Sequence, residues 1–212
     1  MAEFSRDDID QMQYLYRINL INGCSGYKSA NLIGTKSEDG TPNVAIFSSV
    51  THLGSNPGLL GFFLRPTTVM RNTYHNLKTT GFYTINHVFE DILVDAHHTS
   101  AKYDESISEF NVTDLEEVYK NNFLAPFVKG SPVQIAMRYV EEYPIKANNT
   151  ILVVGKIEKL YITDDLLEND GYINLAKGNV ATINGLDGYS IPSLKMRQDY
   201  QRPKPKFAKT ND

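Results

Sequence analysis

Asn31–Phe62 reads NLIGTKSEDGTPNVAIFSSVTHLGSNPGLLGF, and this stretch decides the fold. Two runs with apolar positions flank the pair Asp39-Gly40, which is a frequent turn signal between antiparallel strands. A nearly continuous apolar run, Gly58–Leu64, follows and predicts a buried strand that ends before Pro66. The stretch therefore predicts a hairpin and then a core strand, which together begin an antiparallel sheet.

Further strands and short helices are predicted on both sides of this stretch. Apolar residues at three- and four-residue spacing predict helices over 7–20, 68–77, 92–101 and 114–120, the first ended by Asn22-Gly23. Alternating or continuous apolar runs predict strands over 27–36, 43–50, 58–64, 81–88, 133–142 and 150–162. Neither a glycine-rich dinucleotide motif nor a phosphate-loop motif is present. The pattern favours a mainly β fold, an antiparallel β-barrel with peripheral helices.

Composition limits the classes of protein. The chain has 212 residues, a formal net charge of −4 and a single cysteine, Cys24. We expect one domain over 1–212, with an N-terminal helical extension at 1–25 and a Pro/Lys-rich tail at 195–212. The charge argues against a nucleic-acid partner, and no apolar run is long enough for a membrane span. With no signal-peptide pattern, we expect a cytoplasmic protein. One cysteine excludes an internal disulfide, and a buried thiol is the favoured interpretation.

Small hydroxyl residues at the end of a predicted strand form the first candidate site. Ser48, Ser49, Val50 and Thr51 follow the apolar part of the run 43–50. Small side chains let a planar ligand approach the backbone, whose free amides can then donate to ring carbonyls and ring nitrogens. An edge strand with solvated serines is the alternative interpretation.

Two arginines six residues apart form the second candidate site. Arg65 and Arg71 flank hydroxyl residues and a predicted helix start, and Asn72 and Thr73 follow at once. Guanidinium groups, hydroxyls and free helix amides are the donors that bind phosphate. Surface arginines paired to carboxylates would explain the same residues.

Adjacent histidines form the third candidate. His97 and His98 point about 100° apart on a helix, so they cannot chelate one metal ion; no metal site is expected. A histidine here would serve as general acid, proton relay or hydrogen-bond donor to a cofactor. A structural histidine is the alternative for either residue.

The order of these segments resembles the flavin reductase-like family of FMN-binding split barrels, which includes flavoredoxins. The matching segments extend over about three quarters of the chain. They are Asn31–Phe62, RPTTVMRNTYHNLKTTGFYTINHV (65–88), AHHTSAKYDESISEF (96–110), APFVKGSP (125–132), ILVVGKI (151–157), DGYINL (170–175) and INGLDGY (183–189).

The resemblance implies a six-stranded Greek-key barrel, a homodimer and an FMN cofactor near the subunit interface. By position it implies a cofactor-binding set that lines the flavin ring, the ribityl chain, the phosphate end and the substrate opening. This set is Asn43, Ser48, Ser49, Val50, Thr51, Arg65, Arg71, Asn72, Thr73, Thr99 and Ser100, with His98 as the tentative catalytic residue. Many members have Lys-Asp-Thr where this chain has Arg71-Asn72-Thr73, so the acid is lost while the charge is kept.

The implied activity is an FMN-dependent oxidoreductase. It would pass a hydride from NAD(P)H to the flavin and electrons on to a flavin, quinone, metal or protein acceptor. A non-catalytic FMN-binding carrier or flavin-responsive interaction protein would use the same binding residues. An enzyme similar to pyridoxamine phosphate oxidase is a third interpretation, which the ordered segments match less well.

Overall fold

The predicted hairpin is present in the computed structural model, which describes residues 1–66, 71–104 and 106–202. Strands β2 (Asn31–Lys36) and β3 (Pro42–Phe47) pair antiparallel. The turn between them contains Gly40 at a φ of 95°, a left-handed conformation that favours glycine. The hydroxyl of Ser37 bonds to the carboxylate of Asp39 and accepts a hydrogen bond from the backbone N–H of Thr41, which fixes the turn.

Seven strands form one antiparallel sheet in the order β3-β2-β6-β9-β10-β5-β4. Strand β5 pairs with β10 and not with β6, which is the next strand of this sheet along the chain. Strands β5, β6, β9 and β10 therefore have Greek-key order. The remaining members of the sheet are β4 (Thr51–Ser55), β5 (Gly58–Leu64), β6 (Phe82–His87), β9 (Val133–Ile145) and β10 (Thr150–Ile162). The mainly β fold is confirmed, with seven strands in this sheet where the resemblance implied six.

The core lies on both faces of β2. Leu32 packs into a cluster with Val44 and Ala96, whereas its neighbour Ile33 packs into a second cluster with Phe62. Successive side chains of a strand point to opposite faces, so β2 separates two apolar clusters. Full burial of one such side chain contributes about 1.5–3 kcal/mol. Helix α3 (Asn72–Thr80) covers one cluster through Leu77, and α4 (Leu93–His98) covers the other.

Several sequence predictions in the sheet domain differ from the structure. Strand β4 was not predicted, because its five residues are mostly polar and exposed. The helix predicted over 114–120 is wrong, since Glu117–Val118 is strand β7, paired with β8 (Phe127–Val128). The helix predicted over 68–77 starts later, at Asn72, and its positions 68–70 lie outside the described residues.

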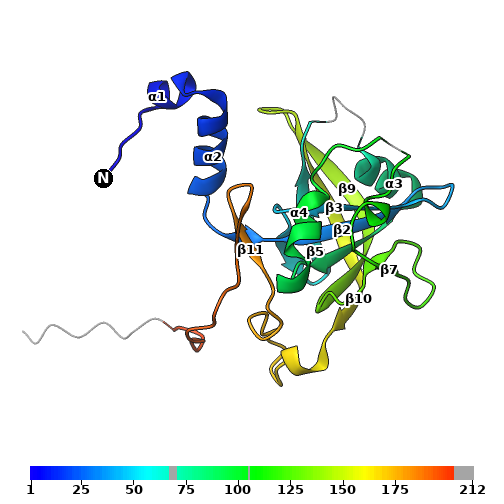
Figure 1. The fold of residues 1–212 in the computed structure, drawn as a ribbon. Helices are drawn as coiled ribbons and strands as arrows, with labels where there is room; N and C mark the ends of the chain where they lie inside the picture. The colour runs from blue at the N-terminus through cyan, green and yellow to red at the C-terminus, as the bar shows by residue number, and fades with distance from the viewer. Residues whose placement is uncertain (67–70, 105, 203–212) are drawn as a thin grey trace, which may run out of the picture.

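The N-terminal extension is an arm of two helices. The single helix predicted over 7–20 is divided into α1 (Arg6–Gln11) and α2 (Tyr14–Cys24), because the backbone leaves helical geometry at Met12. The pair Asn22-Gly23 does not stop α2, which ends at Cys24. Neither helix has a buried residue, and Figure 1 shows both projecting away from the sheet. Cys24 is exposed, so the prediction of a buried thiol is wrong.

Small elements complete the described chain. A second sheet has the order β1-β11-β12, formed by Lys28–Ser29, Thr182–Asn184 and Gly188–Ser190. Three short 3-10 helices lie at η1 (Glu90–Ile92), η2 (Glu109–Asn111) and η3 (Asp164–Leu166). In the predicted tail, residues 195–202 have no regular secondary structure, and 203–212 lie outside the described residues. Within the described ranges, no helix is both long and apolar enough to cross a membrane.

Candidate functional site

The link between β3 and β4 carries the predicted hydroxyl site. Ser48, Ser49 and Val50 lie outside the strands, and Thr51 begins β4 with an exposed side chain. The Ser49 hydroxyl accepts from the Phe63 backbone N–H at 3.0 Å and donates to the Phe63 carbonyl at 3.1 Å. Ser49 thus ties the link to β5, and its hydroxyl is used within the chain.

A buried polar network surrounds Asn43. Its side-chain oxygen accepts from the Thr35 hydroxyl at 3.2 Å and from the Thr73 hydroxyl at 3.1 Å, and its amide donates to Glu109. The Val44 backbone N–H donates to the same Glu109 oxygen at 3.1 Å. Burial raises the pKa of Glu109, while these hydrogen bonds oppose the rise. Asn43 and Thr73, two predicted cofactor residues, are therefore in direct contact.

The two predicted arginines lie near the start of α3, where the positive charge of Arg65 acts on Arg71. Arg71 is the N-cap residue of α3, and Arg65 follows β5 with an exposed side chain. Burial, and then the charge of Arg65, lowers the pKa of Arg71. Within the described chain neither arginine pairs with a carboxylate, so carboxylate pairing does not explain them there.

Arg71 has a buried donor group that a phosphate could satisfy. Its Nε is buried and has no hydrogen-bond partner, although a buried donor without a partner costs about 1–3 kcal/mol. The first turn of α3 receives no side-chain cap from Arg71, and a helix N-terminus favours negative charge. A phosphate group would satisfy the donor and the helix end together, so the residues present fit the phosphate of a flavin nucleotide.

A pocket of about 240 Å³ lies next to this helix start. Its walls come from the β2–β3 hairpin, the first turns of α3 and the segment before η2. Ser37, Asp39, Thr41, Pro42, Asn43, Asn72, His75, Asn76, Ser106 and Ile107 line it. Asn43 and Asn72, both predicted from the sequence, thus border one cavity.

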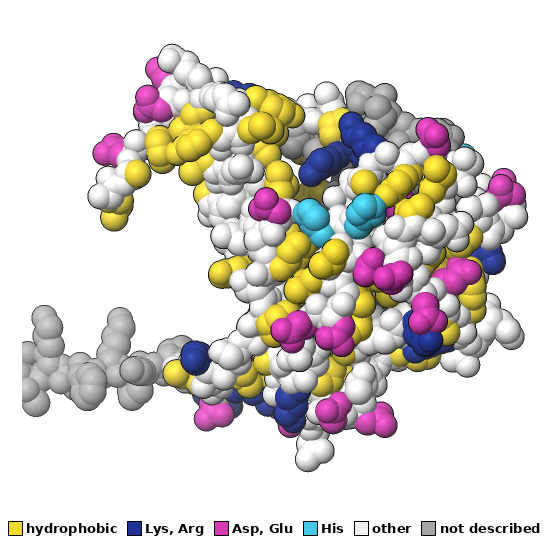
Figure 2. Space-filling model, in the orientation of Figure 1, with side chains coloured by type: hydrophobic (Ala, Val, Ile, Leu, Met, Phe, Trp, Pro, Cys, Tyr) yellow, Lys and Arg dark blue, Asp and Glu magenta, His cyan; other side chains and the backbone are white. Residues whose placement is uncertain are grey.

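The predicted residues at the end of α4 form a separate group. The His98 ring contacts the Tyr103 hydroxyl, and Thr99 donates to the Ala96 carbonyl at 2.8 Å, while Ser100 is exposed. In the described part of the chain no hydrogen bond or ion pair joins these three to Asn43 or Thr73. Figure 2 shows two histidine side chains in the region of α4, at a hollow that faces the arm. No three potential metal-ligating residues gather among the described residues.

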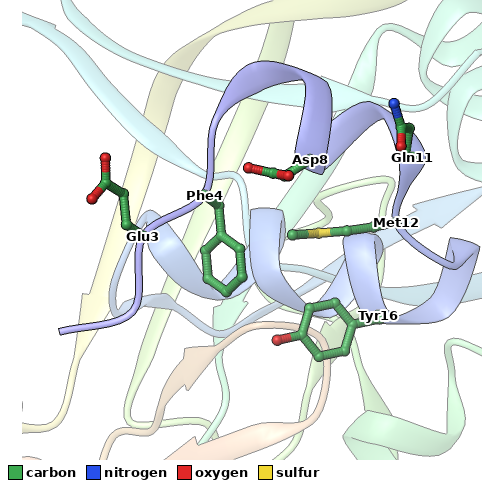
Figure 3. Close-up of a pocket in the computed structure, with 6 residues that line it drawn as sticks. All are labelled: Glu3, Phe4, Asp8, Gln11, Met12 and Tyr16. Atoms are coloured by element: carbon green, nitrogen blue, oxygen red, sulfur yellow. The ribbon is translucent and has the colours of Figure 1, made fainter.

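A larger hollow, of about 470 Å³, lies on the arm itself (Figure 3). Phe4, Met12 and Tyr16 supply its apolar wall, and Glu3, Asp8 and Gln11 complete the lining. None of the predicted cofactor residues borders this hollow. Its open, exposed position on two helices without buried residues makes it part of the arm surface and not of the candidate site.

Three members of the buried network were not predicted: Thr35, Asn76 and Glu109. Asn76 donates to the Thr35 hydroxyl at 3.2 Å, which extends the network along α3. Glu109 is 66 residues from Asn43 in the chain, and no local motif connects the two. Because side chains alternate between the two faces of a strand, the sequence predicts that Thr35 lies on the same face of β2 as the apolar Ile33. This alternation is the one sequence signal that could have indicated a member of the network.

Comparisons with known proteins agree with this fold. Residues 26–183 match the model of the flavin reductase like domain family. A split-barrel-domain protein from Shewanella frigidimarina that carries the name flavin reductase is 41% identical, with a TM-score of 0.92 over 95% of this chain and all of that chain.

Two more distant structures share the fold. Nitrilotriacetate monooxygenase component B from Bacillus cereus is 15% identical, with a TM-score of 0.81 over 93% of this chain and 98% of its own. Flavoredoxin from Desulfovibrio vulgaris is 19% identical, with a TM-score of 0.71 over 82% of this chain and 92% of its own.

The fold is that of a split-barrel flavoprotein. The chain belongs to the flavin reductase-like family. This membership supports a flavin cofactor and a role of the oxidoreductase type. The arm at 1–25 and the chain after residue 183 lie outside the region that the family model matches.

Proposed function

We propose that the protein is an FMN-dependent oxidoreductase that takes a hydride from NAD(P)H and passes electrons to a flavin, quinone, metal or protein acceptor. The observation that carries the proposal is the buried, unpartnered Nε of Arg71 at the N-terminus of α3, beside the pocket that Asn43 borders. FMN has a phosphate that can bind such a donor, and when bound it would supply the hydride-accepting ring.

In this proposal the chain's own residues bind and orient the cofactor. Arg71 holds the phosphate as a charged hydrogen-bond donor, with Arg65 adding positive charge and the first turn of α3 adding its amides. Backbone amides of the link from Ser48 to Thr51 face the ring. Thr99 and Ser100, after His98 on α4, border the substrate opening. No side chain needs to act as acid or base.

The visible spectrum tests the proposal. We expect the purified protein to be yellow, or to bind added FMN at micromolar concentration with a shift of the long-wavelength flavin band. In anaerobic mixing with NADH or NADPH, we expect this band to bleach within seconds. A protein that bleaches with dithionite alone would be the non-catalytic carrier. A colourless protein that binds no FMN would refute both functions.

We also propose a homodimer, in which the arm packs against a second copy. Tyr14, Leu15, Tyr16 and Ile21 of α2 are between 47 and 65% exposed. Together they expose apolar surface on the order of 400 Å² per arm. Two exchanged arms and the surfaces that receive them would bury roughly 1,600 Å², the size of a standard stable interface. Figure 2 shows apolar side chains along the arm.

A charge placed on the arm should therefore weaken the dimer. For Leu15→Glu we expect sedimentation as a monomer at micromolar concentration, because a carboxylate would be buried without a partner. Leu124→Glu is the matched control, since Leu124 is 45% exposed on a loop of the sheet domain. A Leu15→Glu protein that sediments as a dimer would exclude the arm from the interface.

A further inference from the structure

Glu109 is a buried carboxylate that connects distant parts of the chain. It belongs to η2 and is 9% exposed, yet in the described chain it has no positively charged partner. One of its oxygens accepts from the Asn43 amide and from the Val44 backbone N–H. Two donors that converge on one oxygen suit a carboxylate, which is an acceptor at every lone pair.

The hydrogen bonds continue from Glu109 through Asn43 into α3. Asn43 accepts from Thr73, in the first turn of α3, and from Thr35 of β2, which in turn accepts from Asn76 one helical turn later. Thr35 is fully buried, and Asn43, Thr73 and Asn76 are each at most 5% exposed. Fully satisfied buried networks of this kind hold their members in one arrangement.

A network that ends on Glu109 thus holds α3 at Thr73 in its first turn and at Asn76 in its second. Arg71 is its N-cap residue, and Asn43, Asn72 and Asn76 border the neighbouring pocket. We infer that Glu109 is a positioning residue for the phosphate end of the flavin site. This inference rests on the proposed function. It assigns a role to a residue that touches neither the arginines nor the pocket.

The carboxylate matters for its two acceptor bonds and not for its charge. Both donors meet the same oxygen of Glu109, so a glutamine could accept both hydrogen bonds through its amide oxygen. Glu109→Met removes both acceptors at similar size, and leaves the Asn43 amide and the Val44 N–H without a partner unless the network rearranges. Since Asn43 fixes Thr73, such a rearrangement would move the start of α3. Removal of the negative charge alone would act in the opposite direction, because it would favour binding of the phosphate dianion.

The ratio of the riboflavin dissociation constant to the FMN dissociation constant isolates the phosphate contribution. Both flavins are titrated into full-length wild type and Glu109→Met, with flavin fluorescence as the signal. We expect the ratio to fall by about tenfold in Glu109→Met, with riboflavin affinity nearly unchanged. Glu90→Met, at an exposed glutamate of η1, should keep the wild-type ratio.

Two outcomes would overturn the inference. An unchanged ratio would show that Glu109 does not position the phosphate end, and a raised ratio would show that it acts through its charge. If Glu109→Met does not fold, Thr35→Val tests the same network, because it removes the second hydroxyl donor to Asn43. Wild-type protein that binds no FMN would instead refute the proposed function itself, before any variant is compared.

Discussion

Replacing Arg71 with alanine is expected to weaken FMN binding by about 100-fold, since a hydrogen bond to a charged group contributes about 1.5–3 kcal/mol. Arg71 carries the buried Nε that lacks a partner, and it stands at the N-terminus of α3. Isothermal titration of the variant with FMN measures the loss. Riboflavin, which has no phosphate, should bind the variant and the wild type with similar affinity.

The matched control is Arg65→Ala. Arg65 is exposed, so water screens its charge and we expect a loss of FMN affinity of less than about tenfold. The pair of variants also decides which arginine makes the phosphate contact, which the sequence left open. Equal losses for the two variants would mean that the phosphate lies between them, and a larger loss for Arg65→Ala would reverse the assignment.

Acid is expected to destabilise the protein through His87. This residue ends β6 directly opposite Asn31 of β2, and its Nδ1 is buried without a hydrogen-bond partner. Burial lowers the pKa of His87 from 6.5 to about 4. As the pH falls below 6.5, His87 takes up a proton in the unfolded chain but stays neutral in the folded chain. The free energy of unfolding therefore decreases between pH 6.5 and 4. The expected loss from this group is about 3 kcal/mol.

Denaturant unfolding at several pH values between 7.5 and 4.5 measures this effect. His87→Gln cannot take up the proton, so its free energy of unfolding should fall less steeply with acid than that of the wild type. His75→Gln is the control, because His75 is exposed on α3 and should leave the pH dependence unchanged. If His87→Gln and wild type lose stability in parallel, the acid sensitivity belongs to other groups.

The sequence predicted those strands whose apolar residues form a clear run along the chain. The bounds of β5 and β10 agree with prediction at both ends, because their apolar runs are continuous and end at clear breaks. Strand β4 gave no such signal, since THLGS is held in place by pairing with β5 and not by its own apolar residues. The strand at Glu117–Val118 likewise depends on its partner β8, which local periodicity cannot show.

The sequence named members of the candidate site but not the hydrogen bonds that join them. Asn43, Asn72 and Thr73 belong to segments whose order resembles the family, and the structure brings all three to the start of α3. The resemblance could not indicate that the Asn43 side chain is already hydrogen-bonded to Thr35, Thr73 and Glu109. Such tertiary hydrogen bonds join residues that no sequence spacing relates.

The exposed thiol at the end of α2 gives the molecule a single native attachment point. Cys24 is the one cysteine of the sequence, and it lies outside the region that the family model matches. A maleimide dye, a spin label or a gold electrode would therefore couple to one defined position and leave the sheet untouched. Immobilised through this thiol, every chain would be attached at the same position, and the proposed electron transfer could be followed as a current.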